Sequence, residues 1–134
     1  EARRCKDIID IIEDKDMNNR EKNHLCVFDE LYSGTNPYEA IGSAYAFLSY
    51  LNKYENVNFV LTTHFLDLCK RMESQKSIQN YHMQVEENGE DFKYTYKMKK
   101  NISTVKGGVK VLRDLKYPKE IIENTRSILQ EITL

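Results

Sequence analysis

The feature that most constrains this chain is residues 25–30, where a short apolar segment runs directly into two adjacent carboxylates. Residues 25–28 (LCVF) have the length and composition of a strand that is buried on both faces of a sheet. Asp29 and Glu30 follow at once. Since open α/β sheets bind their ligands at the carboxyl ends of their strands, we expect chemistry at these two acids.

A helix start follows the acids after a short turn that contains Gly34. Asn36 is a typical N-cap, Pro37 suits the first helical position, and Glu39 stands at N3, where it closes a capping box. Apolar residues at helical spacing then predict a long helix over residues 37–54. Residues 25–54 are therefore predicted to form a strand, an acidic turn and a helix.

A second buried strand is predicted over residues 57–61, and it ends in Thr62, Thr63 and His64. Two strands joined by one helix form a βαβ unit, whose parallel strands end on the same edge. We therefore expect these side chains to share an edge with the two acids. Carboxylates, an imidazole, hydroxyls and helix N-termini together favour a magnesium–phosphate ligand, with one carboxylate free to polarise a water.

The remaining chain predicts a helix up to about residue 13, an antiparallel hairpin and two closing helices. Residues 81–86 and 92–99 alternate apolar and polar side chains on either side of an Asn-Gly turn signal. We expect the aromatic and aliphatic stripe of this hairpin to pack in a core and its lysine row to face solvent, with DNA contact as the alternative for the lysines. Helices are expected at 109–115 and from Pro118 onward. The predicted fold class is α/β, with a parallel sheet core.

Composition narrows the function without choosing it. The chain has 134 residues, enough for one domain, and its 20 basic residues nearly balance 21 acidic ones, so no strong field favours nucleic acid or a membrane. Three cysteines without pair spacing read as reduced, buried thiols of an intracellular protein. No apolar run approaches the ~20 residues of a membrane span. Because the chain opens on a helix-like segment without Met, we expect it to be part of something longer.

Each candidate residue also has a structural interpretation. An aspartate after a strand is often a turn or cap former, which leaves the role of Asp29 and Glu30 open on residue type alone. His64 alone is compatible with a helix cap or a core histidine. The arrangement of these residues, more than any one of them, indicates function.

Four segments resemble the MutS family of DNA mismatch-repair ATPases, whose ATPase domain is of the ABC type. Residues 27–40 (VFDELYSGTNPYEA) resemble its Walker B and D-loop segment, and residues 61–65 (LTTHF) its switch-histidine segment. Residues 106–112 (KGGVKVL) and 117–123 (YPKEIIE) resemble its two closing helices. The first helix would match the helix after the ABC signature. The resemblance implies a partial P-loop NTPase domain over residues 1–134.

The resemblance implies a role for each matching residue. Asp29 would hold Mg²⁺ through water, Glu30 would orient the water that attacks the γ-phosphate of ATP, and His64 would sense that phosphate. The remaining implied nucleotide- and interface-binding positions are the D-loop residues Gly34, Thr35 and Asn36, and Thr63 beside the histidine. The turn departs from the family pattern at residues 31–33 and 36–37, which affects the expected D-loop contacts and leaves the acids unchanged.

The sequence contains no G-x-x-x-x-G-K-[ST] motif, so the Walker A loop that cradles phosphates is absent from it. We expect this chain to be the carboxyl-terminal half of the ATPase domain, and to be inactive alone. The resemblance implies a complete homo- or heterodimer that binds mismatched double-stranded DNA through upstream domains, in the cytoplasm or nucleus, without a membrane. Two alternatives stay open: another ABC-type ATPase of chromosome maintenance, or a non-catalytic dimerisation module.

Overall fold

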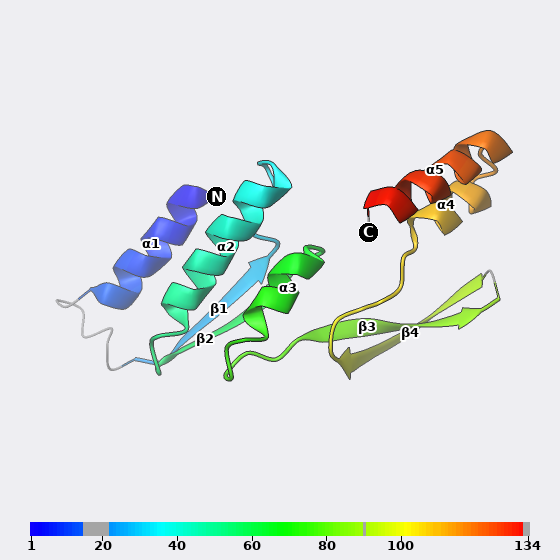
Figure 1. Ribbon diagram of the computed structural model, residues 1–134. Helices are drawn as coiled ribbons and strands as arrows, with labels where there is room; N and C mark the ends of the chain where they lie inside the picture. The colour runs from blue at the N-terminus through cyan, green and yellow to red at the C-terminus, as the bar shows by residue number, and fades with distance from the viewer. Residues whose placement is uncertain (15–21, 90, 133–134) are drawn as a thin grey trace. The chain divides into compact units, whose positions relative to one another are not determined.

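The computed structural model describes residues 1–14, 22–89 and 91–132. Contacts along the chain divide it into two compact units, Glu1–Asn80 and Tyr81–Leu134. The first unit holds two strands and three helices, and the second holds a hairpin followed by two helices (Figure 1). In chain order the elements are α1 (Ala2–Glu13), β1 (His24–Asp29), α2 (Pro37–Leu51), β2 (Val57–Thr62), α3 (Leu66–Met72), β3 (Tyr81–Asn88), β4 (Asp91–Lys100), α4 (Gly108–Asp114) and α5 (Lys119–Ile132).

The first unit contains the predicted βαβ arrangement. Strands β1 and β2 pair in parallel, in a register that sets His24 opposite Val57 and Asp29 opposite Thr62. Helix α2 connects the two strands. Both strands therefore end at the same edge, as the sequence predicts, and each runs there into a loop that leads to a helix (Figure 1). The mixed α/β class with a small parallel sheet is confirmed.

Helices α1, α2 and α3 cover one face of this sheet and form the core with it. Phe28 of β1 meets Phe47 of α2 edge to face, with ring centroids 5.6 Å apart. The largest fully buried side chains are Ile12 of α1, Leu48 and Leu51 of α2, and Leu68 of α3. Each burial of this kind contributes about 1.5–3 kcal/mol relative to exposure. The unit therefore has an apolar core of its own.

The prediction that the first strand is buried on both faces is wrong for this chain. Leu25 and Val27 are 72% and 71% exposed, and Val60 of β2 is 55% exposed. These side chains alternate with covered ones because successive residues of a strand point to opposite faces. Within the described residues the helices cover one face only, so the apolar run places half of its side chains on the open face.

Helix α2 begins as predicted and ends earlier. The Asn36 side chain accepts a hydrogen bond from the Glu39 backbone N–H at 3.0 Å, and Pro37 occupies the first turn. The Glu39 carboxylate accepts from the Thr35 hydroxyl at 2.8 Å, which is a different bond from the reciprocal one of a capping box. The helix ends at Leu51, where the following turn leads into β2.

Two tyrosines of the α2 region fix the end of α1. The hydroxyls of Tyr50 and Tyr54 both donate to the Glu13 carboxylate, the second at 2.8 Å. These two hydrogen bonds lower the pKa of Glu13 below its usual value, because they stabilise the charged form. The Lys53 ammonium lies 4.3 Å from the Tyr50 ring centroid. The contacts join α1 to α2 at the end of α1, where Ile12 enters the core.

The second unit begins with the predicted hairpin. Strands β3 and β4 pair antiparallel, and Gly89 follows the paired Asn88 with a φ of +64°, a conformation that glycine adopts without strain. Asn88, the other residue of the Asn-Gly signal, is the last residue of β3 and pairs with Asp91. Glu90 lies outside the described residues. The exposed lysine row is confirmed.

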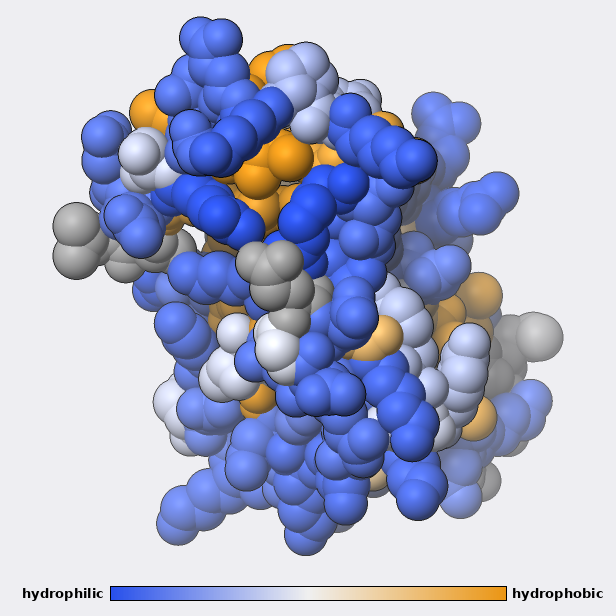
Figure 2. All heavy atoms as spheres, turned by 90° about the vertical axis from the view of Figure 1, so that its right-hand side faces the viewer, coloured by the Kyte–Doolittle hydropathy of each residue, from blue (hydrophilic) through white to orange (hydrophobic). Residues whose placement is uncertain are grey.

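The prediction that the hairpin's apolar stripe packs in a core is wrong. Most of its members are exposed: Tyr81 49%, Met83 56%, Tyr94 61%, Tyr96 86% and Met98 66%. The register shifts between Met83 and Val85, and Tyr96 has a φ of +57°, but apolar residues stay opposite one another, Met83 with Met98 and Val85 with Tyr94. The stripe therefore keeps one face, and the described residues leave most of it uncovered. On the face shown in Figure 2, apolar side chains form exposed patches between charged ones.

Helices α4 and α5 follow the hairpin and contact each other. Neither helix has a buried residue among those described. Residue Lys110 of α4 approaches the Phe92 ring of β4, with its ammonium 5.9 Å from the ring centroid. Among the helices of the described residues, none has the length and apolar character that crossing a membrane requires.

Candidate functional site

The two acids lie where the sequence predicts, at the carboxyl end of β1 beside the end of β2. The Thr62 hydroxyl donates to Oδ1 of Asp29 at 2.6 Å. The backbone N–H of Glu30 donates to the carbonyl of Thr62 at 2.9 Å, which continues the sheet pairing by one residue. The end of β2 therefore holds both the side chain of the first acid and the backbone of the second.

Glu30 contacts His64, although 34 positions separate them. Nδ1 of His64 lies 3.0 Å from Oε1 of Glu30, and both side chains are partly solvent-exposed. The imidazole also packs on its neighbour Phe65, with ring centroids 4.7 Å apart. When Nδ1–H donates to the carboxylate, Nε2 points away from it and remains for another partner. The contact thus joins Glu30, a carboxylate that can accept a proton, to His64, an imidazole that can donate a hydrogen bond to a phosphate oxygen.

The turn after the acids has an unusual backbone. Glu30 and Tyr32 have φ values of 59° and 57°, in the left-handed region that costs residues with a side chain about 1–2 kcal/mol each. Leu31 between them is 4% exposed and belongs to the core. Gly34, the glycine of the predicted turn, is not among the residues with positive φ. The fold thus holds the second acid in a strained conformation, a feature typical of functional sites.

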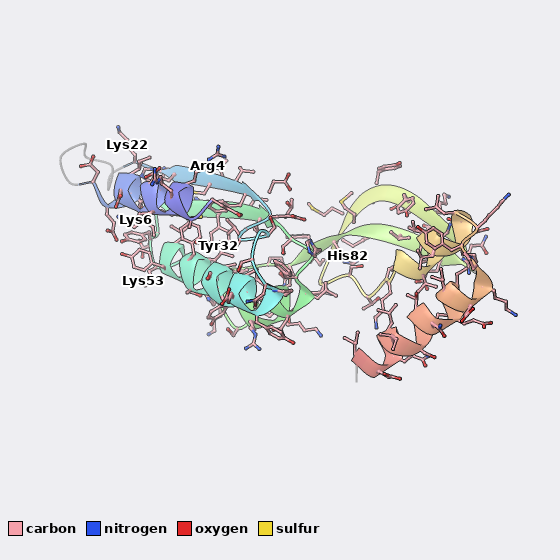
Figure 3. All side chains as sticks on the ribbon, turned by 90° about the horizontal axis from the view of Figure 1, so that it is seen from above. Arg4, Lys6, Lys22, Tyr32, Lys53 and His82 are labelled. Carbon is pink, nitrogen blue, oxygen red and sulfur yellow. The ribbon has the colours of Figure 1, made fainter. Side chains whose placement is uncertain are left out.

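Helix α1 fixes this turn from the other side. The Glu1 carboxylate accepts a hydrogen bond from the backbone N–H of Tyr32. Tyr32 lies between α1 and α2 (Figure 3), and burial together with a hydrogen bond to the Cys5 thiol raises its pKa to about 12. Tyr32 therefore stays neutral at ordinary pH and serves to pack the turn against α1.

The other predicted site residues make local bonds. Thr35 and Asn36 both bond to Glu39 and so belong to the start of α2. The Thr63 hydroxyl accepts from the backbone N–H of Phe65 at 3.0 Å, which closes the turn before α3. Gly34 lies exposed in the loop, with no other residue within 4 Å of where a Cβ would stand. The structure thus brings Asp29, Glu30 and His64 to one edge, whereas the hydrogen bonds of Thr35, Asn36 and Thr63 are to residues near them in the chain.

The cysteines take no part in this edge. All three are free; Cys5 is buried, and Cys26 and Cys69 are half-buried rather than fully buried as predicted. Burial raises the pKa of the Cys26 and Cys69 thiols. Both thiols are therefore protonated near neutral pH, which makes them poor nucleophiles.

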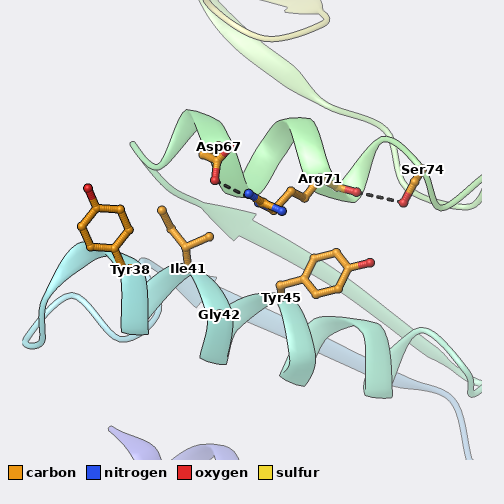
Figure 4. A pocket seen from close by; sticks show the side chains of 7 residues that line it. All are labelled: Tyr38, Ile41, Gly42, Tyr45, Asp67, Arg71 and Ser74. Atoms are coloured by element: carbon orange, nitrogen blue, oxygen red, sulfur yellow. Dashed lines mark hydrogen bonds and ion pairs between the residues drawn. The ribbon is translucent and has the colours of Figure 1, made fainter. Parts of the chain in front are cut away.

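A groove of about 500 Å³ lies between α2 and α3. Its wall includes Tyr38, Ile41 and Tyr45 of α2, and Asp67 and Arg71 of α3 (Figure 4). The Arg71 guanidinium donates to the Asp67 carboxylate at 2.9 Å, so its charge is already paired. None of the predicted site residues lines this groove, which separates it from the edge that holds the acids.

The sequence predicts the Thr62 hydroxyl at this edge but not its bond to Asp29, and it indicates no contact of Glu1 with the turn. The strand pairing rule places Thr62 at the right edge, but its partner becomes visible only with the register that sets it opposite Asp29. The contact of Glu1 depends on how α1 packs against the turn, for which the sequence contains no local signal.

Comparison with known proteins agrees with these motifs. Residues 7–133 match the family model described as MutS domain V. The chain is 30% identical to the DNA mismatch repair protein MutS of Aquifex pyrophilus over 116 residues, which is 87% of this chain and 14% of that protein. It is 27% identical to the DNA mismatch repair protein spellchecker 1 of Drosophila melanogaster over 107 residues, which is 80% of this chain and 12% of that protein. This chain thus spans about an eighth of the length of such relatives, and it belongs to the MutS domain V family.

Proposed function

We propose that this chain is the carboxyl-terminal half of an ABC-type ATPase domain and supplies the hydrolytic residues of a MutS-like DNA mismatch-repair protein. The observation that carries the proposal is the shared edge of β1 and β2. There Asp29 bonds to Thr62, and Glu30 bonds to His64. Family membership supports the same reading, because these residues fall in the matched region.

The proposed mechanism assigns the proton chemistry to Glu30. Its carboxylate orients a water and accepts the proton as that water attacks the γ-phosphate of ATP. His64 holds Oε1 through Nδ1 and leaves Oε2 for the water. In the protonated state, Nε2–H of His64 can also donate to a phosphate oxygen and so register its presence. The strained turn keeps the Glu30 side chain at the edge.

The donor set of this edge fits Mg²⁺. Mg²⁺ binds oxygen ligands, and it commonly takes one or two carboxylates, several waters and the phosphates of the substrate. Asp29 supplies a carboxylate whose Oδ1 is held by Thr62. The described residues contain no cluster of three or more carboxylate, imidazole or thiol ligands, so a cage made only of this chain is not the expected form. When bound, Mg²⁺ would neutralise charge that develops on the phosphates.

The other candidate residues, Thr63 and the D-loop, have proposed roles beside the γ-phosphate and at the subunit interface. Thr63 would lie beside the γ-phosphate, and Gly34, Thr35 and Asn36 would form the D-loop, which meets the second ATPase subunit. The phosphate-cradling loop is not in this sequence, so we expect the chain alone to bind Mg-ATP weakly. Calorimetric titration of the chain with Mg-ATP measures this directly, and micromolar affinity would contradict it.

The complete protein is proposed to couple ATP turnover to the binding of mismatched double-stranded DNA. It would act as a homo- or heterodimer through the ATPase interface, inside the cell and on DNA. The names of the relatives as DNA mismatch repair proteins support this proposal. A non-catalytic dimerisation module is the alternative, and it makes the opposite prediction for the following variant.

Glu30→Gln in the complete protein tests the proposed function. The amide keeps the size of the side chain but cannot accept the proton, so we expect steady-state hydrolysis to fall about 100-fold or more. Nucleotide affinity should change little, since binding depends on other groups. Hydrolysis is measured by phosphate release and affinity by titration with a fluorescent ATP analogue. Undiminished hydrolysis would remove Glu30 from its role and favour the non-catalytic alternative.

A further inference from the structure

Thr62 is the residue at which the two acids are joined to the end of β2. Its side chain and its backbone do different things: the hydroxyl donates to Asp29 Oδ1 at 2.6 Å, and the carbonyl accepts from Glu30 N–H at 2.9 Å. The cross-strand register sets Thr62 directly opposite Asp29. Both residues lie on the exposed side of the sheet edge.

The neighbouring hydroxyls are used elsewhere. Thr63 accepts from the backbone of Phe65, and Thr35 donates to Glu39. Of these three threonine hydroxyls, the one that donates to the Asp29 carboxylate is that of Thr62. The family resemblance implies a nucleotide-binding role for Thr63, whereas the hydroxyl that bonds to Asp29 is that of Thr62.

The chemistry of this contact constrains the carboxylate. A hydrogen bond to an ionised acceptor is short and strong, and 2.6 Å falls within the range for O–H···O⁻. The β-branched side chain of threonine has restricted χ1 freedom in a strand, so its hydroxyl is held in place before the bond forms. With Oδ1 engaged, the rotation of the carboxylate about χ2 is limited, and Oδ2 is the oxygen presented to other partners.

We propose that Thr62 is a positioning residue for Asp29, whose hydroxyl holds the carboxylate so that Oδ2 faces the water shell of Mg²⁺. This inference rests on the proposed function, in which Asp29 holds the metal through water. Mutation of a residue that hydrogen-bonds to a metal ligand, and so orients it, typically weakens metal affinity about 10–100-fold. Because this contact is exposed, we expect the lower end of that range.

The test uses the complete protein and Mn²⁺ as the probe. The concentration of Mn²⁺ that half-saturates the protein, in the presence of a non-hydrolysable ATP analogue, is measured by electron paramagnetic resonance. Four proteins are compared: wild type, Asp29→Asn, Thr62→Val and Thr62→Ser. Valine keeps the shape of threonine without the hydroxyl, and serine restores the hydroxyl. Thr62→Ala also removes the hydroxyl and replaces the valine variant if that one fails to fold, as judged by circular dichroism.

The proposal predicts that Thr62→Val raises the half-saturating Mn²⁺ concentration about tenfold, that Thr62→Ser stays near wild type, and that Asp29→Asn has the largest effect. If Asp29→Asn weakens Mn²⁺ binding while Thr62→Val does not, the positioning role is overturned and the proposed function stands. Equal weakening by valine and serine would also overturn it, because the hydroxyl would not be the cause. If Asp29→Asn binds Mn²⁺ like wild type, the proposed metal role of Asp29 fails, and the inference fails with it.

Discussion

The two units of this chain differ in what they bury. The twelve buried hydrophobic residues of the described chain lie between Cys5 and Met72, all in the first unit. In the second unit none of the described residues is buried, and its hairpin and helices expose large apolar side chains. The residues with candidate chemistry lie in the first unit as well. The first unit therefore contains both an apolar core and the candidate site, while the described part of the second unit has neither.

The two units also differ in how firmly they can hold a side chain in one position. A side chain keeps a defined position when the backbone beneath it is held by packed neighbours. The strained turn at Glu30 has such support, since Leu31 is buried in the core and Glu1 bonds to Tyr32. The positive φ of Tyr96 lies on the surface, where the side chain is 86% exposed and the neighbouring Thr95 hydroxyl donates to the Gln84 carbonyl and accepts from the Lys97 N–H. Backbone strain beside a packed core, as at Glu30, can hold a functional side chain in place. The strain at Tyr96 lies on the surface and does not indicate a site.

The largest effect that would sharpen this comparison comes from truncating a core residue. Leu48→Ala should lower the free energy of unfolding of the 134-residue chain by about 3 kcal/mol, because Leu48 is 1% exposed and its removal leaves a cavity. The matched control is Ile132→Ala in the second unit, where the side chain is 75% exposed, and it should cost less than about 0.5 kcal/mol. Urea unfolding followed by circular dichroism gives both values. Equal costs would break the comparison.

A smaller effect is expected at the start of α2. Asn36→Ala removes the side chain that accepts from Glu39 N–H, and it should lower the free energy of unfolding by about 1 kcal/mol. Asn36→Ser keeps a capping oxygen and should stay within a few tenths of a kcal/mol of wild type. The same urea titration measures both variants. Indistinguishable stability of the alanine and serine variants would show that the cap does not hold the loop.

The smallest effect is a dependence on pH at the junction of α1 and α2. The hydrogen bonds from Tyr50 and Tyr54 lower the pKa of Glu13 in the folded state. Its contribution to stability is therefore present above about pH 4.5, the usual value, and is lost as the pH falls through the lowered pKa. Glu13→Gln should flatten the acid side of a plot of urea midpoint against pH. Parallel curves for the two proteins would contradict this assignment.

Local patterns in the sequence predicted much of the first unit. The apolar run before Asp29, the N-cap at Asn36 and the βαβ rule together place Asp29, Glu30 and His64 at one edge, and the structure has them there. The open face of the sheet was not predictable, because an apolar run does not say whether a second layer covers it. The bond from Thr62 depends on register, and the positive φ at Glu30 depends on contacts with Leu31 and α1.

The hairpin shows the limit of periodicity. Alternation predicted its two strands, and the apolar residues stay opposite one another across the register shift: Met83 pairs with Met98 and Val85 with Tyr94. Alternation shows which side chains share a face of a strand, and it does not show whether another layer covers that face, so it cannot by itself predict burial.

The proposed function requires that the ends of β1 and β2 form one metal–nucleotide site. The most direct measurement is a structure of the complete protein with Mn²⁺ and a non-hydrolysable ATP analogue, in which the metal is located by anomalous scattering. We predict Mn²⁺ about 4–5 Å from the Asp29 carboxylate, the distance of a contact through one water, with Glu30 and His64 facing the γ-phosphate. A triphosphate and metal bound away from this edge, with Asp29 and Glu30 facing solvent, would contradict it.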